Sequence, residues 1–143
     1  MQDDDQLDVI EIDKDLCDLL RQRFGQYRNV HVHCISITQW KPSYSYDFIV
    51  SALPFTAFDP DFVMTILNHY KNIIKNNGLI SYFAYVWMAH IKKIFTWGEA
   101  KIKHVKNMEI MSQFRQSFQF ARDLIFLNIP PANVYHLRMK KSQ

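Results

Sequence analysis

The chain has 143 residues with a formal net charge of +3, and 48% of its residues are hydrophobic and 15% aromatic. This composition excludes a disordered chain and predicts one globular domain over residues 1–143. No apolar run reaches the roughly 20 residues of a membrane span, and an acidic start in place of a basic leader predicts a cytoplasmic protein.

The first predicted strand spans residues 7–13 and ends in two acidic residues, Glu11 and Asp13. A helix follows at once, with Asp13 as its N-cap and Gly25 at its end. In nucleotide-binding α/β folds, such an acidic residue binds ribose hydroxyls and lies about 20 residues after a glycine-rich turn. Glu11 comes too early in this sequence for that turn to precede it. The alternative is a solvated strand end beside a helix cap.

Strands are predicted next at Val30–Cys34 and at Asp47–Ser51, and the second is apolar on both faces, as buried parallel strands are. The loop Ser51-Ala52-Leu53-Pro54-Phe55 follows it, and ligands of open α/β sheets bind beyond such strand ends. Pro54 lacks an N–H, which leaves carbonyl groups to accept hydrogen bonds from a substrate amine. Phe55 is suited to pack on a cation or a flat ring. The alternative is an ordinary connecting loop with a buried phenylalanine.

The next helix has Asp59 as its predicted N-cap, Pro60 at its first position and Gly78 after its last turn, before a strand over residues 79–86. Residues 87–120 are predicted to form a helical insertion or cap, with a break at Gly98. Two strands, over 123–127 and 134–139, close the chain around the turn 128–132. Alternating strands and helices predict an α/β fold with a mostly parallel sheet, helices on both faces and a C-terminal antiparallel hairpin.

Four motifs occur in this order: residues 8–13, 46–55, 77–80 and 128–135. Together they resemble class I S-adenosylmethionine-dependent methyltransferases, and most closely the bacterial phospholipid N-methyltransferases. Those enzymes are similar to the ribosomal RNA adenine dimethylases. The first three motifs are shared widely, whereas the Asn-x-Pro-Pro-Ala-x-Val pattern of the fourth points to the phospholipid branch.

The resemblance implies a Rossmann-like domain that binds S-adenosylmethionine and methylates the amine of phosphatidylethanolamine. Glu11 would bind the ribose, with Ile12 and Ser36 as further cofactor residues. Ser36 stands where the family usually has an acidic residue near the adenine. The catalytic site would be lined by Ser51, Leu53, Pro54 and Phe55. Methylation of adenine in RNA is one alternative, and a catalytically inactive remnant that binds a membrane or a partner is another.

The resemblance also implies that a part of the fold is missing. The family has a strand and a glycine-rich loop before the segment that matches residues 8–13, and that strand lies in the centre of the sheet. The sequence therefore predicts an incomplete methyltransferase domain with two open sheet edges, and open apolar edges favour pairing with another chain. We expect shifted strands, self-association, or residues outside these 143 to close them.

The segment from Trp87 to Lys106 interleaves five lysines with three aromatic residues. Such a segment suits the surface of an anionic phospholipid membrane, here the inner membrane, while RNA binding and a solvated helical face are the alternatives. His31 and His33 share a strand face that Cys34 does not, so no metal site is predicted. Cys17 and Cys34 are expected to be free thiols in a reducing compartment.

Overall fold

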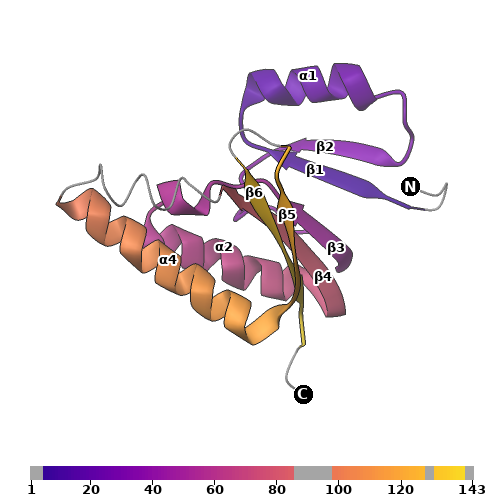
Figure 1. Ribbon diagram of the computed structural model, residues 1–143. Helices are drawn as coiled ribbons and strands as arrows, with labels where there is room; N and C mark the ends of the chain where they lie inside the picture. Colours follow the sequence, from indigo (N-terminus) through magenta and orange to yellow (C-terminus); the bar gives the residue numbers. More distant parts are fainter. Residues whose placement is uncertain (1–4, 86–97, 128–130, 141–143) are drawn as a thin grey trace. The chain divides into compact units, whose positions relative to one another are not determined.

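The computed structural model describes residues 5–85, 98–127 and 131–140 of the chain. The chain divides into two compact units, Met1–Pro42 and Ser43–Gln143, which Figure 1 shows in indigo to violet and in magenta to yellow respectively. Each unit is built on a sheet of its own. Residues 87–97 of the predicted helical insertion and the turn residues 128–130 lie outside the described residues.

The first unit is a strand–helix–strand element made of β1 (Leu7–Glu11), α1 (Lys14–Phe24) and β2 (Val30–Cys34). The two strands are parallel, with Leu7 opposite Val30 and Glu11 opposite Cys34. The Asp13 carboxylate accepts hydrogen bonds from the N–H groups of Asp15 and Leu16, at 2.9 and 3.0 Å. This confirms the predicted N-cap, which satisfies donors that have no partner inside the helix.

The interior of the first unit is small. Cys17 is the one buried hydrophobic residue among residues 5–42, whereas Leu16 and Leu19 on the same helix are 47% and 57% exposed. A chain of roughly 40 residues with so little buried apolar surface does not normally fold alone. The stability of this strand–helix–strand element therefore depends on burial beyond its own contacts.

The second unit contains a four-stranded mixed sheet. Its strands are β3 (Tyr46–Ser51), β4 (Ile74–Tyr85), β5 (Gln119–Ile125) and β6 (Ala132–Arg138), in the spatial order β3-β4-β6-β5. Strand β3 runs parallel to β4, while β6 is antiparallel to both β4 and β5. The predicted antiparallel hairpin at the C-terminal end of the chain is therefore confirmed.

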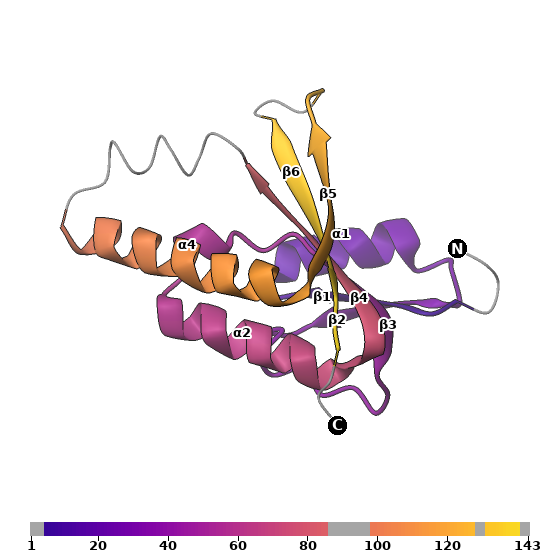
Figure 2. The ribbon, with the colours of Figure 1, turned by 60° about the horizontal axis from the view of Figure 1, so that its bottom comes forward.

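Helices α2 (Pro60–Ile73) and α4 (Glu99–Phe118) lie side by side along the second unit's sheet, as Figures 1 and 2 both show. A single-turn helix, η1 (Phe55–Ala57), precedes α2, and Asp59 caps α2 as predicted by accepting from the Asp61 N–H at 3.2 Å. The core lies between helices and sheet, and its buried side chains include Val63, Ile66, Leu67, Ile80, Met111, Phe114 and Leu137.

The prediction that the second helix continues to Gly78 was wrong, because α2 ends at Ile73 and β4 begins at Ile74. Ile74 is fully buried, and Asn77 adopts a left-handed φ of 62° that bends the new strand. A Cβ on Gly78 would lie 2.6 Å from Cγ1 of Ile74. Gly78 is therefore required by a close contact inside the strand rather than by a helix terminus.

Strand β3 differs from the prediction of burial on both faces. Ser51 is buried against α2, but Phe48 and Val50, which alternate onto the opposite face, are 68% and 85% exposed. Among the described strands, β3 pairs only with β4 and β1 only with β2. Each of these two parallel pairs consequently has an open edge at its first strand.

Candidate functional site

Glu11 ends β1, and its side chain is held by its own backbone. Carboxylate oxygen Oε1 accepts hydrogen bonds from the N–H groups of Ile12, at 2.7 Å, and Asp13, at 2.9 Å. The Glu11 carbonyl oxygen accepts from the Ile35 N–H at 2.9 Å. The carboxylate is thereby oriented at the strand end, where its second oxygen, Oε2, is a further acceptor.

Ser36 follows β2 and lies at the same sheet edge as Glu11, because β1 and β2 run parallel with Glu11 opposite Cys34. Its Oγ lies 3.0 Å from Oγ1 of Thr38. Its carbonyl oxygen accepts from two N–H groups of the following turn. Ile12, the third predicted cofactor residue, is 71% exposed beside Glu11. The structure therefore brings the three predicted cofactor residues of the first unit to the carboxyl edge of its sheet.

A buried polar contact of the first unit was not predicted. The Asp8 side chain is 4% exposed, and its carboxylate lies 2.6 Å from Nε2 of His33. The His33 ring packs on Trp40 with its centroid 3.9 Å away. His33 therefore serves the interior of this unit, and no group of three or more metal-ligating side chains occurs over residues 5–85, 98–127 and 131–140.

The two cysteines are free, as predicted. Burial, and then the hydrogen bond with Cys34, raise the pKa of the Cys17 thiol to about 11. The thiol lies 3.4 Å from the Glu11 carbonyl oxygen as a hydrogen-bond donor. A thiol with so high a pKa is a poor nucleophile at neutral pH, so Cys17 is a packing residue.

In the second unit, Ser51 ends β3 with its hydroxyl group buried. The Tyr70 hydroxyl of α2 donates to Ser51 Oγ at 3.0 Å, and the Leu53 N–H approaches the same oxygen at 3.5 Å. Burial raises the pKa of Tyr70, which keeps its phenol protonated as the donor. The Ser51 hydroxyl thus joins the start of the loop to α2.

The carbonyl groups of the loop already accept hydrogen bonds from the chain. The Leu53 oxygen accepts from the Phe55 N–H at 2.9 Å, and the Pro54 oxygen accepts from the Ala57 N–H at 2.8 Å. Nδ2 of Asn107, on α4, donates to the carbonyl oxygens of Phe55, at 3.0 Å, and Phe58, at 2.8 Å. Each carbonyl oxygen is therefore held in a geometry that the chain itself imposes, and each has a second lone pair.

Asn107 was missed in the sequence, although a signal for it exists. It shares the inward-facing helical stripe of Met111 and Phe114, where a polar residue is out of place. The side chain is fully buried, and its Oδ1 has no hydrogen-bond partner among the described residues. This buried side chain, bonded to the carbonyl groups of Phe55 and Phe58, fixes the end of the loop and the turn after it to α4.

The Phe55 ring belongs to an aromatic cluster rather than to an open face. It is 4% exposed and meets Tyr82 edge-on, with centroids 5.8 Å apart. Tyr82 stacks on Tyr135 at 5.2 Å. Ser51, Tyr82 and Tyr135 are register partners across β3, β4 and β6, so the cluster extends sideways from the loop.

Arg115 of α4 covers this cluster. Its Nη1 donates to the Tyr82 hydroxyl at 3.1 Å, and its guanidinium carbon lies 4.8 Å from the centre of the Tyr135 ring. Burial raises the pKa of Tyr82, and the hydrogen bond from Arg115 partly opposes this shift. Tyr82 therefore stays protonated at neutral pH.

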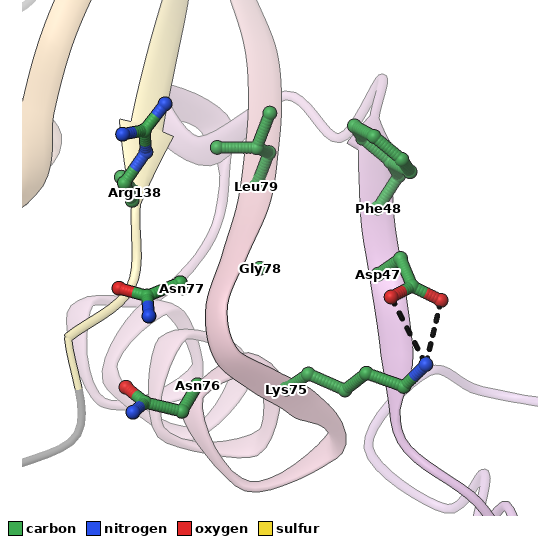
Figure 3. Close-up of a pocket in the computed structure, with 8 residues that line it drawn as sticks. All are labelled: Asp47, Phe48, Lys75, Asn76, Asn77, Gly78, Leu79 and Arg138. Carbon is green, nitrogen blue, oxygen red and sulfur yellow. Dashed lines mark hydrogen bonds and ion pairs between the residues drawn. The ribbon is translucent and has the colours of Figure 1, made fainter.

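A cavity of about 320 Å³ lies at the other end of the β3–β4 pair (Figure 3). Lys75 spans it and binds both carboxylate oxygens of Asp47, at 2.9 and 2.8 Å. The cavity adjoins the amino ends of these parallel strands, whereas ligands of such sheets bind at the carboxyl ends. It is thus separate from the Ser51–Phe55 loop; its other lining residues are Phe48, Asn76, Asn77, Gly78, Leu79 and Arg138.

The structure gathers the predicted site residues into two groups. The cofactor residues lie in the first unit, and the catalytic residues Ser51, Leu53, Pro54 and Phe55 form the loop of the second. Of the motif at residues 128–135, the described part leads into β6 and places Tyr135 in the aromatic cluster. Over the described residues, no helix has the length and hydropathy that crossing a membrane requires.

Comparison with protein-family models and with curated proteins gave no match. Among solved structures, the chain is similar to the N-methyltransferase NodS from Bradyrhizobium japonicum WM9, with 13% identity, a TM-score of 0.70 and coverage of 95% of this chain and 74% of that one. The NodS complex with S-adenosyl-L-homocysteine matches with the same identity and TM-score, over 95% of this chain and 67% of that one. An rRNA methylase from Streptococcus thermophilus matches with 10% identity and a TM-score of 0.63, over 95% of this chain and 74% of that one. The chain therefore has the α/β fold that these methyltransferases share, as the sequence motifs predicted.

Proposed function

We propose that the protein is an S-adenosylmethionine-dependent N-methyltransferase that acts on the amine of phosphatidylethanolamine. The observation that carries the proposal is the Ser51–Phe55 loop at the carboxyl end of β3, bonded to α4 and flanked by an aromatic cluster, in a fold shared with an N-methyltransferase. The Asn-x-Pro-Pro-Ala ending supports a phospholipid as the acceptor.

The cofactor residues fit the group that the proposal requires. Both oxygens of a carboxylate accept hydrogen bonds, and the Oε1 contacts of Glu11 leave Oε2 to bind ribose hydroxyls. Ser36, at the same sheet edge, would offer its hydroxyl group to the adenine of the cofactor. When bound, S-adenosylmethionine supplies an electrophilic methyl group on sulfur. Transfer forms a nitrogen–carbon bond and breaks the carbon–sulfur bond, with the electron pair going to sulfur.

The loop would act on the acceptor by positioning it. Its carbonyl oxygens, already set by Asn107 and by the turn, would accept hydrogen bonds from the amine and aim its lone pair. Alignment of two reactants alone is worth several orders of magnitude in rate. The amine must also lose a proton, and the buried, protonated Tyr70 and Tyr82 do not accept it, so the proton would leave to solvent.

We further propose that the cofactor site is completed by a glycine-rich loop and a strand outside these 143 residues. The open edges of β1 and β3 support this, since parallel strands are normally covered and paired on both sides. Without such a segment the chain would be the inactive remnant, able to bind a membrane or a partner but not the cofactor.

Titration calorimetry with S-adenosylmethionine tests these proposals. We expect binding in a chain extended upstream by a strand and a glycine-rich loop, and its loss in Glu11→Ala of that chain. Leu19→Ala, at a 57% exposed position on α1 outside the predicted cofactor residues, provides the control. Tight binding by the 143 residues alone would contradict the incomplete site, and failure of the extended chain to bind would contradict the cofactor.

Adenine methylation in RNA is the second candidate, and the fold likeness to an rRNA methylase supports it. Methylation assays with labelled cofactor on phosphatidylethanolamine vesicles and on single-stranded RNA separate the two. We expect the chain extended upstream to transfer methyl groups to the phosphatidylethanolamine of the vesicles. Transfer to RNA alone would overturn the lipid assignment, together with the proposed location at the cytoplasmic face of the inner membrane.

A further inference from the structure

Arg115 has an unusual setting for an arginine. It is the one half-buried arginine of the chain, since the other five arginines are exposed. One N–H of its guanidinium group donates to the Tyr82 hydroxyl at 3.1 Å, and the guanidinium carbon lies 4.8 Å from the centre of the Tyr135 ring. The remaining N–H donors of the group's fixed fork are left for another partner.

The charge of Arg115 is not balanced within the part of the chain that the structure describes. The ion pairs there involve Arg21, Lys75, Lys103, Lys106 and two histidines, and none of their carboxylates pairs with Arg115. A partly buried cation costs free energy unless an anion or several acceptors compensate it. An arginine that contacts two aromatic side chains and lacks a carboxylate partner is suited to an anion that accepts two parallel hydrogen bonds, such as phosphate.

The location of Arg115 relates it to the loop. Ser51, Tyr82 and Tyr135 are neighbours in one row across β3, β4 and β6. Adjacent strands are about 4.8 Å apart, so Tyr135 lies about 10 Å from Ser51 along the row. The loop begins at the Ser51 end of this row, Arg122 of β5 stands at the other end opposite Tyr135, and Arg115 lies over Tyr82 and Tyr135 between them.

We infer that Arg115 binds the phosphate group of an acceptor whose amine is methylated at the Ser51–Phe55 loop. The inference rests on the proposed function and names the residue that would recognise the acceptor of the methyl group. In an ethanolamine phosphate, an ethylene unit separates the amine from the phosphate. One such head group therefore presents an amine to the loop and an anion to the arginine, and Arg115 selects aminoalcohol phosphates over other amines.

The test is calorimetry of the full chain with soluble phosphoethanolamine, with ethanolamine and inorganic phosphate as separate probes. The variants are Arg115→Met, which removes the charge, and Tyr82→Phe, which removes only the hydrogen bond to Arg115. Arg28→Met, at an exposed arginine in the turn before β2, is the matched control. We expect phosphoethanolamine binding to weaken about 10- to 100-fold in Arg115→Met, as for a lost charged hydrogen bond, and little in the other two.

An equal loss in Arg28→Met would show that binding follows net charge rather than the setting of Arg115, and would overturn the inference. Equal binding of inorganic phosphate and phosphoethanolamine would overturn the aminoalcohol head group as the ligand. If a short single-stranded RNA displaces phosphoethanolamine from Arg115 at a lower concentration, the ligand of Arg115 is an RNA phosphate and not an aminoalcohol head group.

Kinetics separate this inference from the proposed function. The assay uses a catalytically active chain and vesicles of two kinds. One kind carries phosphatidylethanolamine, and the other carries a diacylglycerol-linked amine without phosphate. We expect Arg115→Met to raise KM about 10- to 100-fold for the first lipid and to leave the second unchanged. If the wild-type chain methylates neither lipid but binds phosphoethanolamine through Arg115, the proposed function fails while the phosphate site stands. A uniform fall in kcat for both lipids would overturn the phosphate site.

Discussion

Nδ2 of Asn107 lies 3.0 Å from the carbonyl oxygen of Phe55, and this contact links α4 to the Ser51–Phe55 loop across 52 residues of sequence. The same amide donates to Phe58 at 2.8 Å. Because one buried side chain holds the last carbonyl of the loop and that of Phe58 after η1, we expect the loop geometry to be sensitive to substitution of Asn107.

Asn107→Ala should destabilise the protein by about 1–3 kcal/mol, since it leaves buried carbonyl groups without a donor. Hydrogen exchange of the Phe55 and Ala57 amides should speed up as the loop loosens. Met111→Ala, which removes a buried neighbour on the same helix but no loop hydrogen bond, is the control. If both variants loosen the loop equally, Asn107 acts by packing and not through its amide.

Asp59 should make stability depend on acid pH. The hydrogen bond from Lys103, whose Nζ lies 2.9 Å from Oδ2, is the largest cause that lowers the pKa of Asp59 below its ordinary 3.8. A lowered pKa in the folded state means stability that is present above the unfolded pKa and is lost as pH falls through the folded pKa. Denaturation by urea from pH 6 down to about pH 2.5 should show this loss, and Asp59→Asn should remove it.

Asparagine is as good an N-cap as aspartate, so this variant keeps the cap of α2 and removes only the charge. In a Lys103→Met background the same change should have a smaller effect, because the largest cause of the shift is gone. Asp61→Asn, on the same helix turn, is the control. If the unfolding free energy of Asp59→Asn falls with pH as steeply as that of the wild-type chain, Asp59 does not cause this pH dependence.

The sequence predicted what neighbouring residues determine, and missed what distant contacts determine. The caps at Asp13 and Asp59 are local, since each carboxylate bonds an N–H two residues on, and both were predicted. The predicted helix end at Gly78 was wrong because Ile74 is buried in the core as the first residue of β4. Arg115 bonds Tyr82 over a separation of 33 residues, which no local pattern indicates.

Ser51 offers a test of whether its hydroxyl has a structural role. Ser51→Ala and Tyr70→Phe each remove the same 3.0 Å hydrogen bond, and each should cost about 0.5–1.5 kcal/mol of unfolding free energy. The double variant should cost little more than either single one, because the two groups share one bond. If Ser51→Ala abolishes methyl transfer while Tyr70→Phe leaves it intact, the Ser51 hydroxyl acts on substrate rather than on Tyr70.

The open edge of β3 should cause self-association of the 143-residue chain. Val50 and Phe48 expose apolar side chains next to backbone groups that no described strand pairs, and such edges associate unless charged residues protect them. Val50→Lys should therefore shift the chain toward monomer in sedimentation velocity. Met64→Lys, which adds the same charge at a 44% exposed position on α2, should not.

A wild-type chain that stays monomeric at the concentrations used for crystallisation would contradict edge pairing, and an equal effect of both lysines would assign the change to net charge. Suppression of self-association by an upstream strand added in cis would instead identify that strand as the native partner of this edge.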